Sequence, residues 1–199
     1  NDNQGRAIAS DGINIIVNSI NDAPIIVDQG LISTNEDVSI EILVTDLTIT
    51  DIDNQFLNQF TVTVLGGENY SVDSTFITPS LNFYGDVLVP VYVDDGEEQN
   101  SQSNTFSLLV SILPVNDPPI IEDQVDLFTF EEQAIEITLD SIIVSDVDAE
   151  NIYPIGYTLN IIETDSFTVL GSAVTPKDNF YGNLSVPIVV NDGSEEFSD

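Results

Sequence analysis

Residues 82–96 read NFYGDVLVPVYVDDG and carry the clearest strand pattern in this 199-residue chain. Four valines stand at alternate positions from Val87 to Val93, so they lie on one face of an extended strand. Asn-Phe-Tyr-Gly before the valines and Asp95-Gly96 after them are turn-forming sequences. The stretch therefore predicts a strand with one buried face and a turn at each end.

The same pattern returns 97 positions later. Residues 179–193 read NFYGNLSVPIVVNDG, with apolar residues at the places of the four valines: Leu184, Val186, Ile188 and Val190. Further one-sided alternations are Phe106, Leu108, Val110 and Ile112; Ile40, Ile42 and Val44, matched by Ile135, Ile137 and Leu139; and Phe60, Val62 and Val64, matched by Tyr157, Leu159 and Ile161. Short alternating strands at intervals of roughly 10–15 residues predict an all-β sandwich.

Acidic motifs recur as well, mostly at a spacing of 95 positions. Asn21-Asp22 returns as Asn116-Asp117, Glu36-Asp37 as Glu131-Glu132, Asp51-Ile52-Asp53 as Asp146-Val147-Asp148, and Asp95-Gly96, 97 positions on, as Asp192-Gly193. Packing does not require a surface carboxylate to keep its place in a repeat. The recurrence therefore indicates a function that both copies share.

The repeat divides the chain into two units, because self-similarity at a fixed period outweighs length as a guide to domain number. Residues 1–21 are expected to be the last strand of a preceding repeat, 22–116 the first repeat, and 117–199 a second repeat lacking its last strand. We therefore expect a fragment of a longer array. The unpaired strand near Ile13–Val17 is expected to fill the vacant place in the second repeat of a neighbour, by head-to-tail strand donation.

The charge balance excludes several classes of partner. The chain has 35 acidic residues against Arg6 and Lys177, for a net charge of −33. Nucleic acid and anionic membrane surfaces are excluded, because binding them requires Lys and Arg. No apolar run approaches the ~18 residues of a membrane helix.

The residue types that are missing narrow the chemistry further. Without His or Cys the chain lacks the usual general base, the usual nucleophile and the usual ligands of zinc, copper and iron, so we expect no enzyme. The abundant carboxylates suit Ca²⁺ or Mg²⁺. Because no EF-hand loop occurs, a cation site must be assembled from distant segments.

These motifs resemble the cadherin repeat, in particular the cadherin-like, tandem-95 type repeats of large bacterial surface adhesins. The likeness covers almost the whole chain, and it implies tandem cadherin-like, Ig-like Greek-key β-sandwich repeats in a linear array. In that family equivalent groups meet around calcium at the junctions between repeats. Carried over, the middle junction comprises Glu36, Asn116, Asp117, Asp146, Asp148 and Asp192, with Asp37 as a further candidate; a partial upstream junction comprises Asn21, Asp22, Asp51, Asp53 and Asp95.

The resemblance implies a calcium-rigidified extender in the stalk of an extracellular, cell-surface bacterial adhesin, acting in adhesion and biofilm formation. Adjacent repeats of the same chain are then the partners, and one to three ions are expected per junction. The distal ligand stays open, with polysaccharide as a candidate. The alternatives are a carbohydrate-binding β-sandwich module, which exposed Tyr70, Tyr84 or Tyr181 rings favour, and a spacer without specific metal.

Overall fold

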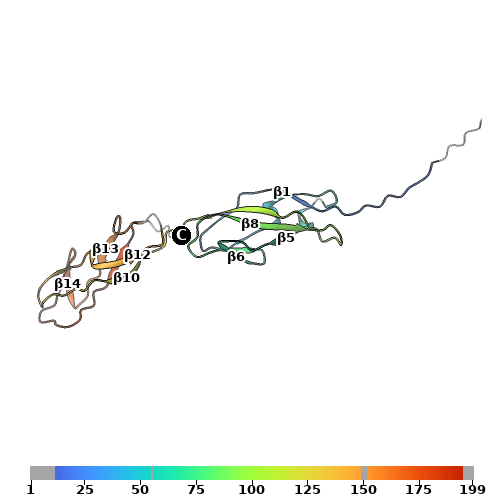
Figure 1. The fold of residues 1–199 in the computed structure, drawn as a ribbon. Coiled ribbons are helices and arrows are strands. Elements are labelled where there is room, and N and C mark those ends of the chain that lie inside the picture. Colours follow the sequence, from blue (N-terminus) through green and yellow to red (C-terminus); the bar gives the residue numbers. More distant parts are fainter. Residues whose placement is uncertain (1–11, 55, 149–151, 195–199) are drawn as a thin grey trace, which may run out of the picture. The chain divides into compact units, whose positions relative to one another are not determined.

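The computed structural model describes residues 12–54, 56–148 and 152–194 (Figure 1). The chain forms two compact units, Asn1–Leu113 and Pro114–Asp199, which are described separately below. The described residues form β-strands and three short 3₁₀ turns, with no α-helix, so the predicted all-β class is confirmed. Within these residues, no helix has the length and apolar character needed to cross a membrane.

The described residues of unit 1 form a sandwich of nine strands. They are β1 (Ile25–Gln29), β2 (Ser33–Asn35), β3 (Ile40–Glu41), β4 (Leu47–Thr50), β5 (Thr61–Val64), β6 (Tyr70–Asp73), β7 (Phe76–Pro79), β8 (Gly85–Asp94) and β9 (Phe106–Leu113). One sheet has the order β2-β9-β8-β5, in which β2 runs parallel to β9 and the other pairs are antiparallel. The remaining strands form the sheets β1-β4 and β3-β7-β6.

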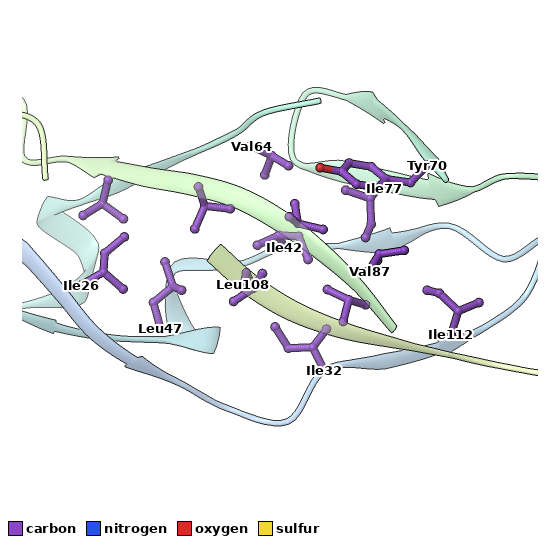
Figure 2. Close-up of a cluster of buried hydrophobic side chains, with 14 of the residues drawn as sticks. Ile26, Ile32, Ile42, Leu47, Val64, Tyr70, Ile77, Val87, Leu108 and Ile112 are labelled. Carbon is purple, nitrogen blue, oxygen red and sulfur yellow. The ribbon is translucent and has the colours of Figure 1, made fainter. Parts of the chain in front are cut away.

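The core of unit 1 lies on the predicted face of β8 and β9. The valines from Val87 to Val93 are at most 4 % exposed, and Leu108, Val110 and Ile112 are equally buried. Side chains from several segments gather in the core, among them Ile26, Ile42 and Leu47 (Figure 2). Burial of this many branched side chains, each worth about 1.5–3 kcal/mol, is the main stabilising contribution in the unit.

One predicted strand of unit 1 is shorter than its alternation suggests. Residues 40–44 were expected to form a single strand, but β3 ends at Glu41 and a 3₁₀ turn, η1 (Val44–Asp46), follows. The Asp46 side chain accepts a hydrogen bond from Leu43 N at 2.7 Å, which stabilises this turn in place of the strand. A second turn, η2 (Leu57–Gln59), precedes β5.

Unit 2 repeats much of this arrangement. Its strands are β10 (Ile120–Gln124), β11 (Ile135–Glu136), β12 (Ile142–Ser145), β13 (Thr158–Ile161), β14 (Phe167–Leu170), β15 (Ala173–Pro176) and β16 (Ile188–Asn191), with a 3₁₀ turn, η3, at Leu139–Ser141. The sheets are β10-β12, β11-β15-β14 and β13-β16. The β1–β4 and β10–β12 pairs even share a register irregularity two residues from the start. As in unit 1, the strand expected over residues 135–139 gives way to a 3₁₀ turn.

Unit 2 differs from unit 1 where β8 and β9 would pair. The strand expected over residues 184–190 begins only at Ile188, and residues 182–187 belong to no strand pair among the described residues. Among the residues of unit 2 that the structure describes, the core cluster has three buried members, Ile137, Phe167 and Val174. Residues 12–20 form no strand, and the earlier part of the strand expected near the start lies outside the described residues.

Candidate metal centre

At one end of unit 1, side chains from three separate segments meet. Asn21 Nδ2 donates to Asp95 Oδ2 at 2.9 Å, and Asp22 N donates to Asp53 Oδ2 at 2.9 Å. Asp53 N in turn donates to Asp51 Oδ1 at 2.7 Å. The structure therefore brings together all five residues that the sequence assigned to the upstream junction.

Local backbone geometry holds the acids of this cluster. Asp51 follows β4. Its Oδ1 accepts hydrogen bonds from Asp53 N at 2.7 Å and from Asn54 N at 3.1 Å, which makes an Asx turn. Asp95 follows β8, and its Oδ1 accepts from Glu97 N at 3.0 Å. Gly96, which stands between Asp95 and Glu97, has a φ of +82°, a value that residues other than glycine rarely adopt. The Asp-x-Asp and Asp-Gly motifs thus act first as turns and, through these turns, position carboxylates.

Unit 2 builds the same cluster again. Asn116 Nδ2 donates to Asp192 Oδ2 at 2.9 Å, and Asp117 N donates to Asp148 Oδ2 at 2.7 Å. Asp148 N donates to Asp146 Oδ1 at 3.0 Å, as Asp53 N does to Asp51. Five of the six residues predicted for the middle junction therefore lie together within unit 2.

The two clusters differ at one position where the alternation indicated only a strand residue. Tyr157 OH donates to Asp146 Oδ2 at 2.5 Å, whereas Phe60 stands at the equivalent position of unit 1. Phe60 has no hydroxyl to donate, and Asp51 Oδ2, which is buried, has no hydrogen-bond partner among the described residues. The replacement of Phe by Tyr at a core position beside an Asp-x-Asp is the sequence signal that identifies this contact.

The pKa of Tyr157 reports how the carboxylates of unit 2 converge. Burial raises this pKa most, and the hydrogen bond to Asp146 raises it further. The negative charges of Asp146, Asp192 and Asp148 add to the effect. Three of the predicted ligands therefore lie close enough to one phenol to act on it electrostatically.

Glu36 and Asp37 lie at the opposite end of unit 1, directly after β2. Glu36 is only 4 % exposed, and its backbone N donates to Leu113 O at the end of β9, at 2.9 Å. Asp37 has φ +60°, and its Oδ1 accepts from Asn82 N at 3.0 Å. Since β8 separates Asn82 from Asp95, the two ends of unit 1 are roughly 30 Å apart.

The clusters carry negative charge, and the chain has only two basic residues against 35 acidic ones. Asp95 and Asp192 are each 8 % exposed, and burying an unpaired carboxylate is costly. The described residues of unit 1 contain neither Lys nor Arg. A buried oxygen without a partner on Asp51, among further carboxylates, matches the all-oxygen donor set that Ca²⁺ prefers.

The aromatic residues considered for sugar binding are dispersed. Tyr70 is buried, and its hydroxyl donates to Leu65 O at 3.0 Å. Tyr84 and Tyr181 are exposed, but they belong to different units. Within either unit, the described residues therefore bring no two of these three rings to the surface together.

Comparison with known proteins finds a family model for part of the chain and several similar solved structures. Residues 21–107, less than half of the chain, match the model of the bacterial Ig domain family. The fold is similar to that of the protocadherin γB4 extracellular domain, with 16 % identity and a TM-score of 0.40 over 82 % of this chain and 28 % of that one. No curated protein matches the chain. The Ig-like class expected from the sequence is confirmed.

Proposed function

We propose that this chain is a calcium-rigidified extender segment from the stalk of a large extracellular bacterial adhesin. Calcium held at the junctions between consecutive units fixes the angle between them. Bacterial Ig modules, whose family model matches unit 1, are typical of surface proteins and act structurally, which supports this location and role.

The observation that carries the proposal is the acidic cluster built twice with the same contacts. In both units an Asn-Asp pair precedes the first strand and bonds to an Asp-x-Asp and an Asp-Gly turn far along the chain. Asn21 and Asn116 donate to the carboxylates of Asp95 and Asp192, which are each 8 % exposed. A shared cation-binding role explains both the recurrence and the burial.

Chain connectivity allows the middle site to draw on unit 1 as well. Glu36 is hydrogen-bonded to Leu113, the last residue of β9, and Asp117 follows Leu113 by four residues. Four extended residues span at most about 14 Å. Glu36, with Asp37 beside it, is thus tethered within reach of the acids that begin unit 2, which helps to supply the six to eight oxygens of a calcium site.

The proposed mechanism is electrostatic. Glu36, Asp117, Asp146, Asp148 and Asp192 repel one another in the absence of a counterion, so the linker bends freely. A bound divalent cation supplies the positive charge that makes convergence of these groups favourable. The cluster Asn21, Asp22, Asp51, Asp53 and Asp95 serves the same purpose toward whatever unit adjoins unit 1. Affinities of ~10⁻⁴–10⁻³ M suffice for an extracellular module.

Small-angle scattering of the full chain in calcium and in chelator, at matched ionic strength, tests the proposal. We expect chelation to lower the mean radius of gyration while both units stay folded by circular dichroism, because the angle between them is no longer fixed. A radius of gyration that is the same in both conditions contradicts the extender mechanism.

Charge-neutral variants test the assigned ligands. Asp146→Asn with Asp148→Asn keeps the hydrogen-bond acceptors but removes two charges, so we expect at least ~10-fold weaker calcium binding at the middle junction by calorimetry. Glu163→Gln with Asp165→Asn removes two exposed charges at the same spacing in the same unit and is the control. Equal affinities for the two double variants would count against the assigned ligands.

A further inference from the structure

Equivalent core positions of the two units carry aromatic rings that differ by one hydroxyl. Phe60 directly precedes β5, and Tyr157 directly precedes β13. In both units the first residue of that strand pairs with the residue just before the Asp-Gly turn. The two residues are also buried alike, at 7 % and 6 % exposed. The rings therefore take the same place in the fold, and the hydroxyl is what distinguishes them.

In unit 1 the first acid of the Asp-x-Asp motif has one buried oxygen without a partner. Asp51 Oδ1 accepts hydrogen bonds from Asp53 N and Asn54 N, whereas Asp51 Oδ2 is buried and accepts none within the described part of the chain. A carboxylate oxygen that is cut off from both water and donors is unfavourable. This oxygen is therefore an open position for a cation ligand.

In unit 2 the hydroxyl covers the equivalent oxygen. Tyr157 OH donates to Asp146 Oδ2 at 2.5 Å, and Asp146 Oδ1 accepts from Asp148 N at 3.0 Å. Both oxygens of the Asp146 carboxylate are thus already engaged. Because the phenol is a neutral donor, it satisfies the oxygen without removing its negative charge.

Packing holds the hydroxyl in this position. The Tyr157 ring meets the Tyr153 ring edge to face, with centroids 5.2 Å apart and an interplanar angle of 75°. Tyr153 OH in turn donates to Leu139 O. A buried ring that is packed in this way does not turn its hydroxyl into solvent without disturbing its neighbours. A cation that binds Asp146 Oδ2 must therefore compete with the Tyr157 hydrogen bond.

We infer that Tyr157 raises the calcium concentration at which the unit 2 cluster fills, because its hydroxyl competes with the cation for Asp146 Oδ2. The inference rests on the proposed function, since it concerns the same ligands. A hydrogen bond to a charged group is strong enough for its loss to lower the affinity ~10-fold. Phe60 imposes no such cost on the unit 1 cluster. One ring position thus gives consecutive junctions different calcium thresholds, and an array of such units stiffens in stages as calcium rises.

Calorimetry of the full chain tests the inference. Asp51→Asn with Asp53→Asn first disables the unit 1 cluster, so that the measured affinity belongs to unit 2. In this background Tyr157→Phe should bind calcium ~10-fold more tightly. Tyr70→Phe is the control, because the Tyr70 hydroxyl is also buried but donates to a backbone carbonyl, Leu65 O. It should leave the affinity unchanged.

The reverse change in unit 1 tests the same competition without altering the ring of unit 2. Phe60→Tyr, in a chain whose unit 2 cluster is disabled by Asp146→Asn with Asp148→Asn, should weaken calcium binding ~10-fold, because it places a hydroxyl beside the open Asp51 oxygen. This second measurement keeps the inference falsifiable even if Tyr157→Phe prevents unit 2 from folding.

Nuclear magnetic resonance of the tyrosine rings gives a readout that is separate from affinity. The chain has six Tyr, so each ring signal is assigned by its loss in the corresponding Tyr→Phe variant. Calcium should shift the Tyr157 signal, because the bond to Asp146 is weakened, and should leave the Tyr70 signal in place.

Three outcomes overturn the inference. Weaker calcium binding by Tyr157→Phe shows that the hydroxyl orients Asp146 as a ligand instead of competing for it. An unchanged affinity, with a Tyr157 signal that calcium does not move, shows that the hydroxyl and the cation share no oxygen. A wild-type chain that binds no calcium overturns the proposed function as well, whereas the first two outcomes leave that function standing.

Discussion

The exchange of Tyr157 and Phe60 between equivalent positions gives a sharp test of the acidic clusters. Tyr157→Phe removes the hydroxyl that donates to Asp146 Oδ2 and recreates the state of Asp51 in unit 1. Phe60→Tyr does the reverse, placing a hydroxyl beside the unpartnered Asp51 oxygen. The pair of variants changes one hydrogen bond in each unit in opposite directions.

The expected size follows from the contact. A hydrogen bond to a charged group is worth about 1.5–3 kcal/mol, but Asp146 is only half-buried and water can replace part of the loss. We therefore expect Tyr157→Phe to destabilise unit 2 by about 1–2 kcal/mol in chelator, which corresponds to roughly 4–16 °C for a domain of this size. Phe60→Tyr should stabilise unit 1 by up to the same amount. In calcium its benefit should shrink, because the hydroxyl and the cation compete for the same oxygen.

Differential scanning calorimetry, with hydrogen exchange to assign each transition to its unit, measures both effects. Each variant should move one transition and leave the other in place. If Tyr157→Phe leaves unit 2 unchanged and Phe60→Tyr fails to stabilise unit 1, the contact between the phenol and Asp146 is not what distinguishes the two clusters.

Two further predictions concern unit 1. Burial raises the pKa of Tyr70, so its contribution to stability is fully present below pH ~10 and is lost as pH rises through the higher folded-state pKa. Urea denaturation of Tyr70→Phe should therefore show a smaller loss of stability at alkaline pH than the wild type shows. Phe167 at the equivalent position of unit 2 indicates that a phenyl ring fits there, and an unchanged pH profile would refute this prediction. Leu108→Ala should cost about 2–5 kcal/mol because Leu108 is fully buried. The control Leu109→Ala, on the exposed face of β9, should cost much less, and similar losses for both would contradict the assigned face.

The strand faces were predictable because alternation is a local property. The four alternate valines from Val87 to Val93 are buried as the pattern indicates, and so is Leu108 on β9. The exact lengths were not predictable. The apolar alternation covers residues 184–190, but the paired strand begins only at Ile188. In unit 1 a capped turn ends the strand at Glu41, although the apolar pattern goes on.

The acidic sites divide in the same way. The recurrence at fixed spacing was enough to select Asp51, Asp146 and their partners as a group with a common role. Ligation itself stays a prediction. Which oxygen is covered, and which has a partner, depends on Phe60 and Tyr157, whose contacts with the acids cannot be read from spacing alone.

The amino-acid sequence alone determined the all-β class, the two repeats and the acidic residues that repeat with them, because periodicity and spacing are written along the chain. Only the tertiary structure decided which strands find partners and which carboxylate oxygens are buried. These properties depend on contacts such as Asp22 to Asp53 and Asn116 to Asp192, which join residues 31 and 76 positions apart. Local patterns do not encode such pairings, since they arise when the whole sheet closes over its core.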